Sequence, residues 1–114
     1  MTPYEPGDVV LVRFPFTDLA SSKKRPAVVL NPPQYSEAHA DVVILALTSR
    51  VQTDDALALE QWQEAGLPKK TWAKPVIGTV AGTLIERKVG SLRLRDHACV
   101  KAAIRLLMDP RFLS

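Results

Sequence analysis

A short segment that is apolar on both faces, Asp8 to Phe14, constrains the fold of this chain most. At the two-residue period of a β-strand, Val10 and Val12 lie on one face, and Val9 lies with Leu11 on the other. A strand with one solvated face would instead alternate between apolar and polar residues. The pattern therefore predicts an inner strand of a small β-barrel.

The following segments continue this pattern of short strands separated by turn residues. Strands are predicted at Arg25 to Asn31, Asp41 to Thr48, around Ala56 to Leu59, Thr71 to Val80 and Thr83 to Leu92. Pro32 and Pro33 cannot donate to a β-ladder and are expected to end the second strand, whereas Trp62 to Gly66 is expected to form one helical turn. The sequence thus predicts a mainly β fold, a compact antiparallel barrel.

The C-terminal segment changes to a helical period. From His97 to Met108 the only residues that are not apolar are His97, Lys101 and Arg105, which are spaced by four. Asp96 is expected to cap the start of this helix. Because one small barrel covers only part of such an apolar surface, the pattern also predicts a second subunit or a bound partner.

Length and composition limit the function classes. The chain has 114 residues, 46% of them hydrophobic, which predicts one globular domain over residues 1–114 and argues against disorder. With Cys99 as the single cysteine and with His39 and His97 far apart, we expect no disulfide, no metal site and no cofactor. The first residues lack a basic and apolar leader, and Val42 to Leu47 is too short to span a bilayer, so we expect a cytoplasmic protein without membrane contact.

Basic residues form three groups, although the net charge is only +3. The groups are Lys23, Lys24 and Arg25; then Lys69, Lys70 and Lys74; then Arg87, Lys88, Arg93 and Arg95. This distribution is compatible with a polyanionic partner, and equally with a solvated surface of mixed charge.

Strand order brings two polar residues into proximity. If the second and third strands are antiparallel neighbours, Arg25 at the start of one meets Thr48 at the end of the other, and Lys23 and Lys24 lie over the same rim. The planar donor fork of a guanidinium suits a phosphate. From spacing alone, a surface ion pair for Arg25 and an inert strand end for Thr48 remain open.

The segment GDVVLVRFPFTDLASSKKRPAVVLN, Gly7 to Asn31, resembles the opening of the MazF/PemK family of type II toxin-antitoxin ribonucleases. The resemblance continues through DVVILALTSR (Asp41 to Arg50), AGLPKKTWAKP (Ala65 to Pro75) and the segment from Ile85 to Leu92, and so covers nearly the whole chain.

This resemblance implies an SH3-like barrel of the MazF and CcdB type with a C-terminal helix, a homodimer, and a cognate antitoxin that blocks the RNA groove. It implies metal-independent, sequence-selective cleavage of single-stranded RNA, including mRNA, to 2′,3′-cyclic phosphate and 5′-hydroxyl ends. The family's catalytic residues fall on Arg25 and Thr48. Residues expected to hold the flanking nucleotides are Phe16, Thr17, Lys23, Lys24, Ser49 and Arg50. Operator DNA is a further expected partner, through the toxin-antitoxin complex.

One departure from the family pattern leaves the acid-base chemistry open. Some members carry an arginine and an aspartate where this chain has Gly78 and Ala81, so no role is transferred to these positions and attenuated activity is expected as an alternative. Two other functions stay open: a gyrase poison of the CcdB type, and a barrel that retains only antitoxin or operator binding. Arg25 and Thr48 favour cleavage, because gyrase poisoning needs no phosphate-directed residues at this rim.

Overall fold

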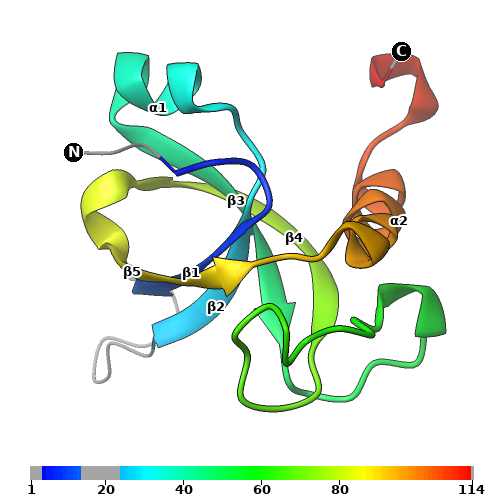
Figure 1. The fold of residues 1–114 in the computed structure, drawn as a ribbon. Helices are drawn as coiled ribbons and strands as arrows, with labels where there is room; N and C mark the ends of the chain where they lie inside the picture. The colour runs from blue at the N-terminus through cyan, green and yellow to red at the C-terminus, as the bar shows by residue number, and fades with distance from the viewer. Residues whose placement is uncertain (1–3, 14–23, 114) are drawn as a thin grey trace, which may run out of the picture.

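The computed structural model describes residues 4–13 and 24–113, which form a strongly curved antiparallel sheet with a helix near the C-terminal end (Figure 1). The strands are β1 (Asp8–Arg13), β2 (Lys24–Val29), β3 (Asp41–Thr48), β4 (Trp72–Ala81) and β5 (Ile85–Ser91), in the spatial order β4-β3-β2-β1-β5. The predicted mainly β, barrel-like architecture is confirmed, as a sheet whose edge strands are β4 and β5. Phe14, the predicted end of the first strand, lies outside the described residues.

The sheet buries both of its faces, which explains the apolar character of β1 on both sides. β1 is an inner strand, as predicted, and it pairs with β2 and with β5. One core cluster takes side chains from all five strands, including Val10, Ala27 and Ile85, as the inner face of a curved sheet does. The other cluster joins Val9 and Leu45 to the C-terminal helix and to residues 49–71, the β3–β4 connection. Val9, Val10 and Val12 are therefore all buried, although successive side chains point to opposite faces.

The C-terminal helix, α2 (His97–Leu107), ends one residue before its predicted end. It buries Cys99 and Ala103 against the sheet, and its polar residues Lys101 and Arg105 are exposed. Four short 3-10 helices flank the regular elements: η1 (Asp55–Leu57), η2 (Gly82–Leu84), η3 (Leu94–Asp96) and η4 (Pro110–Phe112). No helix in the described part of the chain is long and apolar enough to cross a membrane.

Helix α1 (Pro33–His39) was not expected from the sequence. Proline is tolerated in the first turn of a helix, where its missing N–H would have no partner, so Pro33 starts a helix. β2 already ends at Val29, two residues before its predicted end at Asn31. The buried Asn31 side chain supports this start by donating to Ser36 Oγ at 2.8 Å and accepting from Val43 N at 2.8 Å. Its carboxamide thereby ties α1 to β3.

The prediction of a strand around Ala56 to Leu59 is wrong. The carboxylate of Asp54 accepts a hydrogen bond from Ala56 N at 2.9 Å and starts η1 instead. Only Ala58 makes an isolated bridge, to Trp72. The alternation that suggested a strand reflects the burial of Leu57 and Leu59 in the core. The helical turn predicted at Trp62 to Gly66 is present as a hydrogen-bonded turn.

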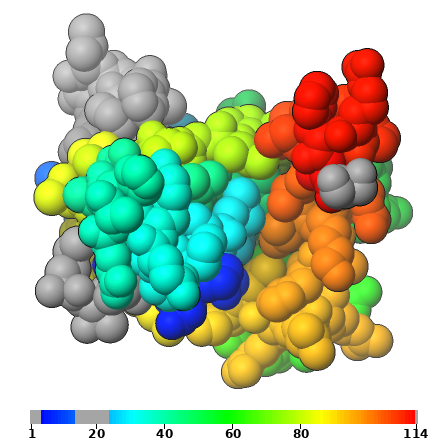
Figure 2. Space-filling view, turned by 90° about the horizontal axis from the view of Figure 1, so that it is seen from above, coloured from blue at the N-terminus to red at the C-terminus, as the bar shows by residue number. Residues whose placement is uncertain are grey.

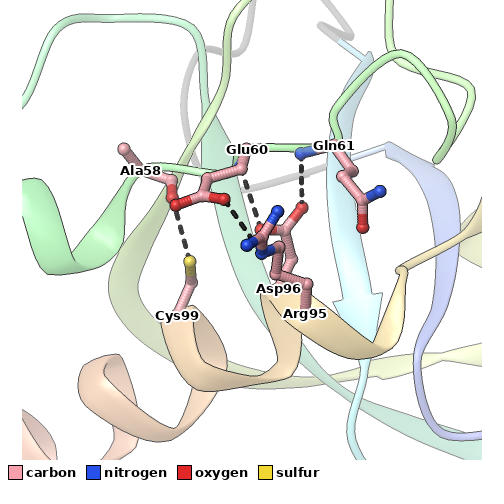
Figure 3. Close-up of polar contacts among 6 residues, drawn as sticks. All are labelled: Ala58, Glu60, Gln61, Arg95, Asp96 and Cys99. Atoms are coloured by element: carbon pink, nitrogen blue, oxygen red, sulfur yellow. Dashed lines mark hydrogen bonds and ion pairs between the residues drawn. The ribbon is translucent and has the colours of Figure 1, made fainter.

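The side chain of Asp96 does not cap α2, which corrects the sequence prediction. Asp96 is almost completely buried, and its carboxylate accepts hydrogen bonds from Glu60 N at 2.9 Å and Gln61 N at 2.8 Å (Figure 3). Nearby, Cys99 Sγ donates to the Ala58 carbonyl oxygen at 3.0 Å. These contacts, here called the Asp96 clamp, tie the β3–β4 connection to the start of α2.

The end of the chain presents apolar side chains to solvent. The segment after α2 forms a protrusion beside the helix, drawn in red beside orange in Figure 2. Its large exposed residues, together with the last turn of α2, form the C-terminal apolar patch: Leu106, Leu107, Met108, Phe112 and Leu113.

Candidate functional site

The pairing of β2 with β3 places Arg25 beside Thr48. The register pairs Val28 with Leu45 and Ala27 with Ala46, and continuing it by two residues sets Arg25 opposite Thr48. The geometry predicted from strand order alone is therefore present. Both residues lie where the two strands reach the same end of the sheet.

Around these two residues lies a polar hollow of about 530 Å³, here called the Arg25 pocket. It is lined by Arg25, Thr48, Ser49, Arg50, Gln52 and Lys74. Three of these side chains are cationic, and no carboxylate or imidazole lines the pocket within the described residues. A pocket of this kind attracts an anion, because none of its described lining residues is a carboxylate that would neutralise its positive charge.

A turn after β3 fixes the orientation of the Thr48 hydroxyl. Thr48 Oγ1 accepts a hydrogen bond from Arg50 N at 3.1 Å, and Gln52 Nε2 donates to the Arg50 carbonyl oxygen at 3.0 Å. A hydroxyl has one proton to donate besides its acceptor lone pairs. With a lone pair occupied by Arg50 N, the Thr48 O–H remains available to an anionic oxygen in the pocket.

Lys74 reaches the pocket through an irregularity in β4. The partner of Leu45 is Ile77 and the partner of Leu47 is Ala73, so two steps along β3 match four steps along β4. Pro75 lies in this bulge, as expected for a residue that cannot donate to a ladder. Bulges re-aim side chains, and here the neighbouring Lys74 lines the Arg25 pocket.

The sequence prediction had placed Lys74 in a basic group but not in the site. Pro75 within a strand pattern was the signal that could have located the bulge. Gln52 had no such signal.

The other predicted RNA-binding residues divide into three sets. Ser49 and Arg50 line the Arg25 pocket. Lys24 does not line it: it is the first residue of β2 rather than part of a loop, and its ammonium lies 2.6 Å from the Glu86 carboxylate. Phe16, Thr17 and Lys23 lie outside the described residues.

Gly78 and Ala81 lie away from the pocket. Gly78 pairs with Ile44 and Ala81 with Asp41, near the other end of β3 from Thr48. At roughly 3.3 Å per residue along a strand, Gly78 is about 13 Å beyond Lys74. Lys74 is thus the β4 residue that supplies charge to the pocket.

Metal binding and thiol chemistry find no support in the described residues. They contain no group of three or more His, Cys, Asp or Glu side chains that could hold a metal ion. Burial, together with the nearby carboxylates of Asp96 and Glu60, raises the pKa of the Cys99 thiol to about 11. Cys99 is therefore a protonated, structural side chain at neutral pH and not a nucleophile.

One family model matches the chain over most of its length. The family model described as "PemK-like, MazF-like toxin of type II toxin-antitoxin system" matches residues 5–108. No curated protein sequence matches the chain.

Solved structures with the same fold are distant in sequence. An endoribonuclease in complex with its cognate antitoxin from a mycobacterial species is 16% identical, with 90% of this chain and 92% of that chain covered and a TM-score of 0.69. A MazE-MazF complex from Deinococcus radiodurans is 17% identical, with 94% and 96% covered and a TM-score of 0.71. The Mycobacterium tuberculosis toxin MazF-mt6 is 17% identical, with 90% and 98% covered and a TM-score of 0.66.

Proposed function

Because the chain belongs to the PemK-like, MazF-like toxin family of type II toxin-antitoxin systems, we propose that it is a metal-independent endoribonuclease that cuts single-stranded RNA in the Arg25 pocket. The observation that carries this proposal is the convergence of Arg25, Arg50 and Lys74 with the Thr48 hydroxyl in one hollow. Cationic and hydroxyl donors around a phosphate stabilise the negative charge that develops on it during cleavage of a phosphodiester. Two solved relatives with this fold are themselves described as endoribonucleases.

RNA supplies its own nucleophile for this reaction. The ribose 2′-oxygen attacks the adjacent phosphorus, a new O2′–P bond forms, and the bond from phosphorus to the 5′-oxygen of the next nucleotide breaks. The 2′-hydroxyl loses its proton and the departing 5′-oxygen gains one. The products are a 2′,3′-cyclic phosphate and a 5′-hydroxyl, and the enzyme has to align the chain and stabilise charge.

Each side chain of the pocket has a place in that scheme. The Arg25 guanidinium donates to the non-bridging phosphate oxygens, on which negative charge grows in the transition state. The Thr48 O–H, oriented by the hydrogen bond from Arg50 N, donates to the same phosphate. Lys74 and Arg50 add positive charge around it. Ser49 and Arg50, which directly follow β3, contact the flanking nucleotides.

Proton transfer is the weaker part of this machinery. Among the described residues that line the pocket there is no carboxylate or imidazole to accept the 2′-hydroxyl proton. General acid-base catalysis typically contributes about 10²–10⁴-fold. We therefore expect a cleavage rate that rests on alignment and charge stabilisation and that is modest for a nuclease.

The preference for unpaired RNA follows from the in-line geometry. The 2′-oxygen, phosphorus and departing 5′-oxygen must become collinear, which a flexible single strand allows and an A-form duplex opposes. Unpaired bases are also open to recognition along their edges. The selected sequence is read by residues around the pocket.

Two protein partners belong to the proposal. An acidic segment of a cognate antitoxin competes with RNA for the cations of the Arg25 pocket, by analogy with relatives solved with antitoxin.

A second copy of the chain covers the C-terminal apolar patch, whose Phe112 is 78% exposed and Leu106 62% exposed. A hollow of about 330 Å³ lies between α2 and the end of β2 (orange and cyan in Figure 2). Its lining gives this interface further apolar surface.

The test is cleavage of a mixed-sequence RNA by the purified chain in excess chelator, followed by mapping of the ends. Arg25→Ala should lower the rate at least 10²–10³-fold, as loss of a transition-state donor does. Arg25→Lys should also lose most activity, because an ammonium lacks the guanidinium fork. Arg93→Ala removes another exposed arginine, outside the pocket, and should cleave normally.

Substitution of deoxyribose at the mapped cut site should block cleavage there, because the nucleophile is then missing. Intact RNA after incubation with folded wild-type protein would overturn the proposed function. Equal cleavage by folded Arg25→Ala and Arg93→Ala proteins would overturn the role of Arg25.

A further inference from the structure

A second hollow lies on the other side of the β2 and β3 ends from the Arg25 pocket. It has a volume of about 380 Å³ and is here called the Leu11 groove. Its floor consists of Leu11 from β1, Pro26 from β2 and Val89 from β5, and Leu67 of the β3–β4 connection forms a wall. Leu11 pairs directly with Pro26, so these two side chains lie together on one face of the sheet. The groove thus has an apolar base, and its volume lies within the range of small-molecule sites.

Cations from three separate parts of the sequence surround this apolar floor. Lys24 comes from β2, Lys69 from the β3–β4 connection and Arg87 from β5. Each of them represents one of the three basic groups of the sequence. No carboxylate lines the groove among the described residues, but the Lys24 ammonium is paired with the exposed Glu86 at 2.6 Å.

The groove and the Arg25 pocket are adjacent. Ser49 lines both hollows. Successive side chains of β2 point to opposite faces, so Lys24 and Pro26 line the groove whereas Arg25 between them lines the pocket. A chain bound with one phosphate at Arg25 therefore has its neighbouring unit within reach of the groove.

Close backbone packing makes the wall of the groove rigid. A Cβ atom added at Gly66 would lie 2.5 Å from the Val89 carbonyl oxygen, and one added at Gly90 would lie 2.2 Å from that of Ala65. The connection therefore touches β5 through its main chain. The Thr71 hydroxyl also donates to the Lys69 carbonyl oxygen at 2.8 Å. A preformed site of this kind loses little conformational entropy on binding.

We propose that the Leu11 groove is a nucleotide subsite that holds the base and the phosphate next to the scissile bond, an inference that rests on the proposed function. The base packs on Leu11, Pro26 and Val89, and the phosphate contacts Arg87 and Lys69. An acidic peptide would match the cations too. RNA is favoured because the groove adjoins the reacting pocket through Ser49 and combines an apolar floor for a base with cations for a phosphate.

The experiment measures binding of a short RNA that contains the mapped cut site, with deoxyribose at the reacting position so that it stays intact. Arg87→Gln should weaken binding about tenfold and lower the salt dependence of log affinity by about one unit, the effect of losing one phosphate contact. The matched control is Arg93→Gln, which removes the same charge outside the groove and should bind as the wild type does. Circular dichroism checks that both variants are folded.

Two further variants separate this role from a structural one. Glu86→Gln releases Lys24 from its ion pair and should tighten RNA binding several-fold, a gain that a destabilised protein would not show. Leu11→Phe fills the floor and should change the nucleotide preference at one position beside the cut, measured by sequencing the cleaved ends of a random RNA pool.

Equal RNA affinities for Arg87→Gln and Arg93→Gln, or an unchanged nucleotide preference in Leu11→Phe, would overturn the subsite. Loss of antitoxin binding without loss of RNA binding in Arg87→Gln would also overturn it, in favour of an acidic peptide as the occupant. Failure of the proposed function itself would appear earlier and separately, as a wild-type protein that neither binds nor cuts RNA.

Discussion

Removal of the Asp96 carboxylate tests whether the clamp between α2 and the β3–β4 connection stabilises the fold. The carboxylate is 1% exposed and accepts two backbone hydrogen bonds, at 2.9 Å from Glu60 N and 2.8 Å from Gln61 N. Hydrogen bonds to a charged group contribute about 1.5–3 kcal/mol each. Relief from burying the charge offsets part of that sum. We expect Asp96→Ala to lower the free energy of unfolding by about 2–4 kcal/mol, a large part of the roughly 5–15 kcal/mol typical of a domain.

The more conservative Asp96→Asn should lower the free energy of unfolding by about 2 kcal/mol, because a carboxamide keeps one acceptor oxygen but turns an N–H₂ donor toward a backbone N–H. Asp54→Ala is the matched control. It removes an exposed carboxylate that also accepts from a backbone N–H at 2.9 Å, and loss of an exposed cap costs about 1 kcal/mol. The comparison isolates the effect of burial.

The assay is urea unfolding followed by tryptophan fluorescence, since Trp72 is buried beside the connection. All variants are measured at one protein concentration, because association couples to stability. An unchanged slope with denaturant would show that the change lies in stability and not in compactness. A loss below about 1 kcal/mol for Asp96→Ala, or one equal to that of Asp54→Ala, would refute the reasoning.

Three other predictions concern the interface, the thiol and the glycine contact. Phe112→Glu should shift the protein from dimer to monomer by light scattering at micromolar concentration, because it places a charge in the exposed C-terminal apolar patch; a retained dimer mass would contradict that interface. Burial raises the pKa of the Cys99 thiol from about 9 in the unfolded chain to about 11, so the contribution of the thiol to stability is complete below pH 9 and is lost as the pH rises toward 11. The unfolding free energy of Cys99→Ala should therefore fall less steeply with pH over that range than that of the wild type. Parallel curves for the two proteins would count against this prediction. Gly90→Ala should destabilise the fold by about 3 kcal/mol, since the added Cβ would lie 2.2 Å from the Ala65 carbonyl oxygen. Gly78→Ala should be close to neutral, because a Cβ added at Gly78 would have no neighbouring atom within 4 Å. Similar melting temperatures for the two variants would disprove the close packing at Gly90.

The strands were predictable because their signals are local. The double-faced apolar pattern of β1 identified an inner strand, and the bounds of β3 from Asp41 to Thr48 agree with the prediction. Pro33 shows the limit of such signals, since a proline that is read as the end of a strand can equally be the start of a helix, as it is here. Asn31 stabilises the helix start, because its carboxamide contacts both α1 and β3.

Long-range contacts account for the other differences. Asp96 stands directly before a helix, where local rules assign it to capping. Its real partners are the N–H groups of Glu60 and Gln61, 36 and 35 residues earlier, and no pattern within α2 indicates them. The proximity of Arg25 and Thr48 was predictable from strand direction alone, but Lys74 depended on a bulge that shifts the register of β4.

The alternation of β2 turns two neighbouring cations toward two different sites. Lys24 lines the Leu11 groove and Arg25 lines the Arg25 pocket, although they are adjacent in the chain. The strand period makes this division obligatory, because a shift of the register by one residue would exchange the two faces. The position of β2 between β1 and β3 fixes that register, with Pro26 held opposite Leu11 and Ala27 opposite Ala46. A small net charge of +3 is therefore no measure of the local field at this end of the sheet. Residues from all three basic groups of the sequence meet there, in two hollows that share Ser49.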